Sequence, residues 1–103
     1  MKLDDLLDQI EQAWAVPEGV LYRLRQGEFD KRAMDHLVEL LRQLEVDAAS
    51  QYLPKRMVRL LWMMPIFVEW QNERVAEQGG SEEDVLKYGN MIYAEIQRLM
   101  GIP

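Results

Sequence analysis

The sequence feature that most constrains this fold is a run of nine residues without a polar side chain, residues 60–68, with a proline at position 65. A helix that is apolar on every side must be covered on every side, by its own domain or by a partner. The run is far shorter than the roughly 20 residues that span a bilayer. We therefore expect it to lie in a protein interior or at an interface.

Pro65 makes this run unusual as a helix. A proline inside a helix removes one amide donor and displaces the carbonyl four residues earlier, here that of Leu61. The segment from Lys55 to about Gln78 therefore either kinks at Pro65 or breaks into two helices with Met64 at the joint. We favour the kink, because neither a glycine nor a capping residue flanks the proline. Four-residue spacing also continues across the proline in three residues: Trp62, Ile66 and Trp70.

The rest of the chain has the three- and four-residue apolar spacing of amphipathic helices. The pattern predicts a helix from about Leu3, a short second helix with Pro17 in its first turn, a third over residues 31–44 and a last helix from residue 82 to about 100. A connection is expected over residues 47–53. The predicted helix boundaries rest on a left-handed glycine and two side-chain caps: Gly27, Asp30 and Ser81. We predict an all-α protein, a compact bundle of four to five helices in a single domain over residues 1–103, with one helix kinked or broken at Pro65.

The chain is acidic, with a formal net charge of −6. An acidic surface disfavours binding to nucleic acid and is compatible with steering a basic protein partner, and the alternative is that the charge only keeps the protein soluble. One local exception is a basic cluster before the apolar run, Lys55, Arg56 and Arg59. Such a cluster can bind phosphates or an acidic partner, but we prefer pairing with the protein's own acids.

Residues that carry catalysis are few. The chain has no cysteine and no threonine, and its only serines and histidine are Ser50, Ser81 and His36. Ser81 is expected to cap a helix, and His36 to face solvent. We predict no enzymatic activity, no cofactor and no metal site. Because the acidic amino terminus does not resemble a targeting peptide, we also expect a cytoplasmic protein that does not bind membranes.

These observations predict a non-catalytic protein-binding module, in the physical style of immunity-protein or antitoxin-like inhibitors that neutralise a basic partner. The alternative is a self-associating helical subunit or adaptor of a larger complex, for instance a homodimer. Kinked apolar helices that expose tryptophan and methionine are suited to such contacts. The predicted partner-binding residues are Asp4, Asp8, Glu11, Trp14, Trp62, Met63, Met64, Trp70, Glu73 and Glu77.

Overall fold

The computed structural model describes residues 2–47 and 49–102. Helix is the regular secondary structure of this part of the chain, so the all-α prediction is confirmed. The helical segments are α1 (Leu3–Ala15), α2 (Val20–Arg25), α3 (Lys31–Gln43), α4 (Lys55–Leu61), α5 (Met64–Trp70), α6 (Asn72–Glu77) and α7 (Glu82–Met100). One or two residues separate α4, α5 and α6, which together replace the single long helix expected there.

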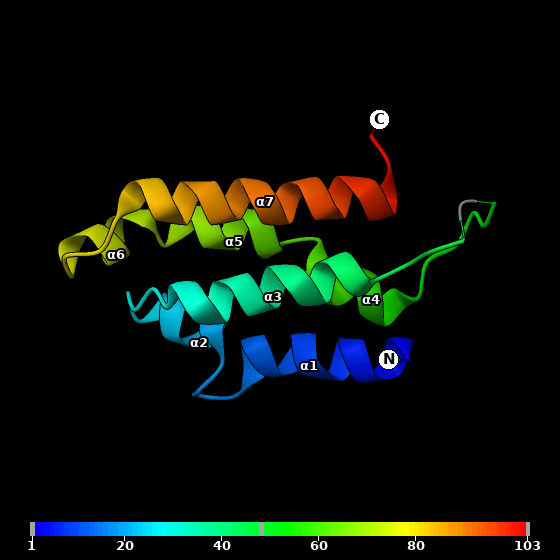
Figure 1. The fold of residues 1–103 in the computed structure, drawn as a ribbon, viewed down its shortest axis with the longest axis horizontal. Helices are drawn as coiled ribbons and strands as arrows, with labels where there is room; N and C mark the ends of the chain where they lie inside the picture. Colours follow the sequence, from blue (N-terminus) through cyan, green and yellow to red (C-terminus); the bar gives the residue numbers. More distant parts are fainter. Residues whose placement is uncertain (1, 48, 103) are drawn as a thin grey trace.

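The three long helices α1, α3 and α7 lie side by side, with α3 in the middle (Figure 1). The short helices pack behind them: α2 and α4 contact α1, whereas α5 and α6 contact α7. The described part of the chain measures 45 × 29 × 19 Å along its principal axes, so its thickness is about that of two helices. A single apolar core runs through both layers, from Leu6 to Leu99.

Local capping sets several helix boundaries where the sequence predicts them. The Asp30 carboxylate accepts a hydrogen bond from the Ala33 amide at 3.1 Å, and the Ser81 hydroxyl accepts one from the Asp84 amide at 3.1 Å. Each bond satisfies an amide that has no partner within its own helix. Gly27 has a φ of +87°, the left-handed conformation expected after α2. Three of the predicted boundary residues are therefore confirmed.

The helical segment is interrupted just before Pro65, so the prediction of a helix kinked or broken at this proline is confirmed. Hydrogen bonding of α4 ends at Leu61, Trp62 and Met63 form a turn, and Pro65 is the second residue of α5. An amide in the first turn of a helix has no intrahelical acceptor, so proline costs nothing there. The proline thus lies in the first turn of α5, directly after the interruption.

Other differences from the predicted elements arise from the chain's surroundings. Pro17 lies in the turn before α2 and not inside it, and the connection after α3 extends from Leu44 to Pro54. The helical segment is interrupted a second time at Gln71, between α5 and α6, although no proline or glycine there predicts an interruption. Beyond this break α6 reaches the end of α2: Arg74 donates to the Arg25 carbonyl, and Gln78 donates to the Gln26 carbonyl at 2.7 Å.

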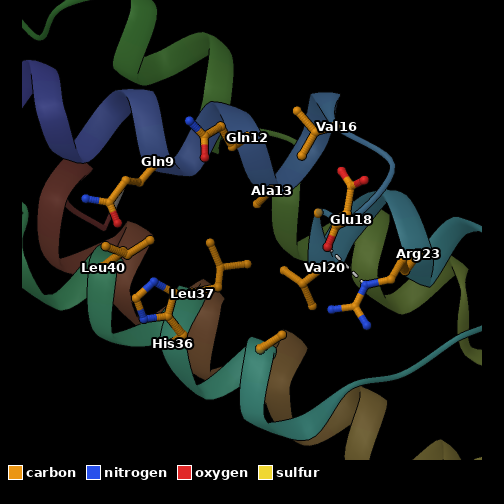
Figure 2. Close-up of a pocket in the computed structure, with 12 residues that line it drawn as sticks. Gln9, Gln12, Ala13, Val16, Glu18, Val20, Arg23, His36, Leu37 and Leu40 are labelled. Atoms are coloured by element: carbon orange, nitrogen blue, oxygen red, sulfur yellow. Dashed lines mark hydrogen bonds between the residues drawn. The ribbon is translucent and has the colours of Figure 1, made fainter.

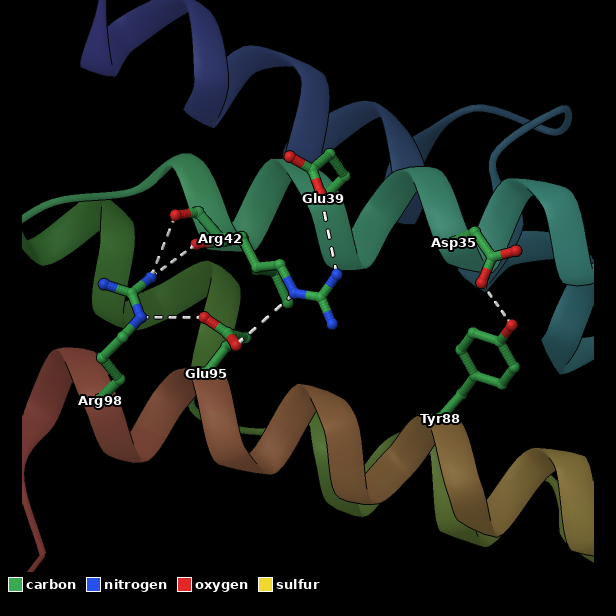
Figure 3. Close-up of polar contacts among 7 residues, drawn as sticks. Asp35, Glu39, Arg42, Tyr88, Glu95 and Arg98 are labelled. Carbon is green, nitrogen blue, oxygen red and sulfur yellow. Dashed lines mark hydrogen bonds and ion pairs between the residues drawn. The ribbon is translucent and has the colours of Figure 1, made fainter.

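Polar contacts fix α3 against α7 (Figure 3). The Arg98 guanidinium donates to the Leu41 carbonyl at 3.0 Å and to the Leu44 carbonyl at 3.1 Å, and thereby caps the carboxyl end of α3. At the other end of this contact the Tyr88 hydroxyl donates to the Asp35 carboxylate. Burial, followed by this hydrogen bond, raises the pKa of Tyr88 to about 12.

Candidate functional site: an exposed tryptophan face beside unpaired carboxylates

Large apolar side chains are exposed along the outer side of α5 and the neighbouring part of α7. The exposed fractions are 57% for Trp62, 41% for Ile66, 68% for Trp70 and 52% for Tyr93. We name these four residues the tryptophan face. Tyr52, Leu86 and Ile102 are exposed as well, but the four residues of the tryptophan face are grouped on two packed helices, and grouped apolar exposure typically marks a binding site.

Helical geometry explains how three of these side chains come to share one side. Residues four apart lie one above the other on a helix, and Ile66 and Trp70 are both in α5. Trp62 precedes α5, but its φ of −60° and ψ of −34° are helical, so the spacing continues through the turn. The opposite side of α5 is buried in the core through Met64, Phe67 and Val68.

Tyr93 reaches the same face from α7 across a small groove. The groove has a volume of about 230 Å³, and its walls are Pro65, Ile66 and Glu69 of α5 and Asn90 and Tyr93 of α7. Gly89 lies at its base, where α5 and α7 come together. A Cβ atom at this glycine would lie 3.6 Å from Cγ of Glu69 and 3.8 Å from the Pro65 carbonyl, both ordinary contacts. Gly89 is itself buried, so a Cβ at this position would be accommodated between α5 and α7 at the base of the groove.

Carboxylates accompany the tryptophan face. Glu69 lines the groove, and Glu73 and Glu77 of α6 line a second depression beside Trp70. None of the ion pairs between described residues includes any of these three carboxylates. The one cation in the second depression, Arg74, is bound to the Arg25 carbonyl. This surface is consequently negative and retains its charge for another molecule.

The predicted acids of α1 have different surroundings. The Arg56 guanidinium lies 2.6 Å from Asp8 and 3.3 Å from Glu11, and Arg59 lies 3.3 Å from Glu11. The Asp8 hydrogen bond raises the pKa of Arg56 above its ordinary value. The preferred interpretation of Arg56 and Arg59, as partners of the protein's own acids, is therefore confirmed. Asp4, in the first turn of α1, takes part in no ion pair within the described chain.

Trp14 serves the fold instead of an open surface. Its indole N–H donates to the Leu60 carbonyl at 3.0 Å, and its ring lies 4.8 Å from the ring of Phe67. Leu60 is in the last turn of α4, where carbonyls lose their intrahelical partners because the helix ends. The indole thus caps the end of α4, and the Trp14 side chain is partly buried against the core.

The two predicted methionines also differ from expectation. Met64 is completely buried, so the prediction that it faces a partner is wrong, because it lies on the core side of α5. Met63 is half-buried and packs against the core from the turn. In their place the structure adds Ile66 and Tyr93. The spacing of Ile66 between two tryptophans was a signal for its exposure, whereas Tyr93 depends on how α5 meets α7.

A separate pocket, away from the tryptophan face, lies between α1, α2 and α3 and has a volume of about 270 Å³ (Figure 2). Ala13, Val20 and Leu37 form an apolar wall, and His36 lies at the edge and is exposed, as expected from the sequence. The one cation there, Arg23, is held by the Glu18 carbonyl at 3.1 Å and by Asp30 at 3.0 Å. Because this charge is already used within the fold, the tryptophan face is the stronger candidate.

Among the described residues no group of three or more His, Asp or Glu side chains is arranged to hold a metal ion. Within the same part of the chain, no helix combines the length and apolar character required to cross a lipid bilayer. Comparison of the chain with protein-family models, with curated proteins and with solved structures finds no match.

Proposed function

We propose that this chain is a protein-binding module that docks a positively charged partner protein on the tryptophan face. The observation that carries the proposal is the combination of exposed Trp62, Ile66 and Trp70 with the unpaired carboxylates Glu69 and Glu73 beside them. We also propose that the chain inhibits this partner, in the manner of an immunity protein or antitoxin, and that it acts in the cytoplasm. The absence of cysteine from the sequence fits a reducing compartment.

The chemistry of the face suits protein recognition. Tryptophan and tyrosine contribute much of the binding energy at protein interfaces, because each buries a large rigid surface at a small cost in entropy. Carboxylates at the rim of an interface increase the association rate with a basic partner and discriminate against acidic ones. Trp70 and Glu73 are neighbours at the same depression, so both effects act on one contact surface.

Self-association is the second candidate, and the charges disfavour it. A symmetric dimer through this face would place the same patch of each copy against the other. Glu69 and Glu73 would then oppose their own symmetry mates or one another, and like charges at close range are repulsive. A basic partner gains attraction from the same carboxylates, and we therefore rank it first.

The test uses the full chain as bait in extracts of its native cell, followed by mass spectrometry. Wild type and a Tyr52→Ala control, which removes an aromatic that is 83% exposed on the loop after α3, are expected to capture the same basic protein. Trp62→Ala/Trp70→Ala is expected to lose it. Light scattering after size exclusion measures whether each free chain is a monomer. Capture that is equal for all three baits, or a dimer that only the double variant disrupts, would contradict the proposal.

A further inference from the structure

We infer that the segment that docks on the tryptophan face is an amphipathic α-helix of the partner with basic residues along its flanks, seated over the Gly89 groove between α5 and α7. This inference rests on the proposed function and specifies the partner's shape and charge.

The shape of the face favours a helix. Ile66 and Tyr93 stand on opposite sides of the groove, Gly89 lines its base without a side chain, and Trp62 and Trp70 extend the apolar surface to both ends along α5. Trp62 and Trp70 are eight residues apart, or about 12 Å at the helical rise. An amphipathic helix presents apolar anchors over the same distance at positions i, i+4 and i+7 or i+8. Its central anchor would enter the groove.

The secondary structure argues against an extended ligand. A bound peptide that adds a strand requires an unpaired sheet edge, whose amides and carbonyls supply most of the affinity. The part of the chain that the structure describes is helical and offers no strand. The sides of α5 and α7 present side chains and no continuous row of free amides and carbonyls, so side-chain packing must supply the affinity. A helix lying in a groove between two helices is the mode of recognition that does so.

Charge identifies which helix fits. Glu69 borders the groove, Glu73 and Glu77 lie beyond Trp70, and Glu82 and Glu83 begin α7. Glu82 and Glu83 line a further depression on α7, and Lys87, in the second turn of this helix, is the one cation in its lining. Lysine and arginine beside the apolar stripe, above all at the end near Trp70, would therefore meet carboxylates that form no ion pair between described residues. A second copy of this chain cannot provide that complement, because its corresponding face is acidic.

The probe is a fluorescein-labelled synthetic peptide of about 18 residues, long enough to match α7, with leucines on one helical face and lysines on its flanks. One control peptide replaces each lysine with glutamate, and a second keeps the composition but scrambles the order, so that the charge remains without the apolar face. Fluorescence anisotropy measures the affinity of each peptide for the full chain. We expect the basic amphipathic peptide to bind at least tenfold more tightly than either control, and less tightly at about 500 mM than at about 50 mM salt.

Two variants locate the site. Gly89→Leu fills the groove from a position where an added Cβ makes only ordinary contacts, and it is expected to weaken binding at least tenfold. Ile66→Ser weakens the wall of the groove without adding volume, and it tests the same site if Gly89→Leu disturbs the packing of α5 on α7. Circular dichroism checks that each variant is folded. Tyr52→Ala should bind as wild type does.

The outcomes separate this inference from the proposed function. If the scrambled peptide binds as well as the amphipathic one, or if Gly89→Leu and Ile66→Ser both bind as wild type does, the helix inference is wrong. If the captured partner still depends on Trp62 and Trp70, the proposed function stands without it. A wild-type dimer that competes with the peptide would instead assign the groove to a second copy and overturn the inference.

Discussion

Two regions of this protein place a tryptophan beside helical carboxylates, but these side chains are paired within the fold in one region and exposed in the other. Where α1 meets α4, the Trp14 indole donates to a backbone carbonyl, and Arg56 neutralises Asp8 and Glu11. Where α5 continues into α6, Trp70 is 68% exposed and Glu73 forms no ion pair with a described cation, because its neighbour Arg74 is bound to the Arg25 carbonyl. The first region uses these residue types to hold the fold together. The second leaves them open, and that difference directs the functional proposal to α5 and not to α1.

The largest expected effect compares the two tryptophans. Trp14→Ala removes the ring packed on Phe67 and the cap of α4, and it should lower the free energy of unfolding by about 3 kcal/mol. Trp70→Ala should change it by less than about 0.5 kcal/mol, because the side chain packs against little. Urea denaturation measures both values. Trp14→Phe keeps an aromatic ring but is smaller and loses the N–H donor, so a loss between about 1 and 3 kcal/mol is expected. Equal losses at both tryptophans would remove the distinction between the regions.

The contact between α3 and α7 joins the two regions and gives a pH prediction. The folded state raises the pKa of Tyr88 to about 12, so it favours the neutral phenol. The resulting stabilisation is complete below pH 10, the ordinary tyrosine pKa, and is lost as the pH rises towards about 12. Tyr88→Phe should cost about 1 kcal/mol at pH 7, because the hydrogen bond to Asp35 is lost.

The measurement for Tyr88 is the urea midpoint of wild type and of Tyr88→Phe between pH 7 and pH 11. The gap between the two proteins should narrow above pH 10, because only the wild type loses the stabilisation of its neutral phenol. A gap that stays constant over this range would show that the hydroxyl does not titrate within the contact.

A smaller effect on stability is expected at Pro65, which lies between the two regions, just after α4 and in the first turn of α5. In the first turn of α5 the proline fits its backbone conformation and restricts the unfolded chain, so Pro65→Ala should lower stability by about 0.4 to 1 kcal/mol. Thermal unfolding measures this loss. A gain in stability would instead indicate that the proline strains the fold, as a proline inside a continuous helix does.

The smallest effects compare the carboxylates. Glu11→Gln should destabilise by at most about 1 kcal/mol at low salt and by less at high salt, because it removes exposed ion pairs with Arg56 and Arg59. Glu73→Gln should leave stability unchanged or slightly higher, since no pair is lost. Double-mutant cycles of Glu11 with Arg59 measure the coupling directly. A larger loss at Glu73 than at Glu11 would reverse the comparison.

The sequence predicts best what nearby residues determine. The caps at Asp30 and Ser81 and the left-handed Gly27 involve residues at most three apart, and all three are confirmed. The sequence predicted an interruption at Pro65, but it did not decide between a kink and a break into two helices. When no side chain caps the start of a helix, as in α5, the local sequence does not distinguish a proline in the first turn of that helix from a proline that kinks a continuous helix.

The missed features depend on distant parts of the chain. The role of Trp14 comes from a contact between α1 and α4 with a partner 46 residues away, and the sequence predicted that Arg56 pairs with acids of this protein but not that its partner Asp8 lies 48 residues away. Spacing placed Trp62 and Trp70 on one side of the helix, but it did not reveal that Met64 is buried or that Tyr93 completes the face. Both depend on the packing of α5 against α7, which no local pattern specifies.

The most direct test of the tryptophan face as a docking surface is the association rate of the captured partner as a function of salt, measured by stopped-flow fluorescence. Three proteins are compared: wild type, Glu69→Gln/Glu73→Gln/Glu77→Gln on the face, and Asp8→Asn/Glu11→Gln on α1. The rates of wild type and of the α1 variant should fall about tenfold or more from low to high salt, whereas the face variant should associate slowly at every salt concentration. The same salt dependence in all three proteins, or its loss in the α1 variant alone, would contradict the assignment of binding to this face.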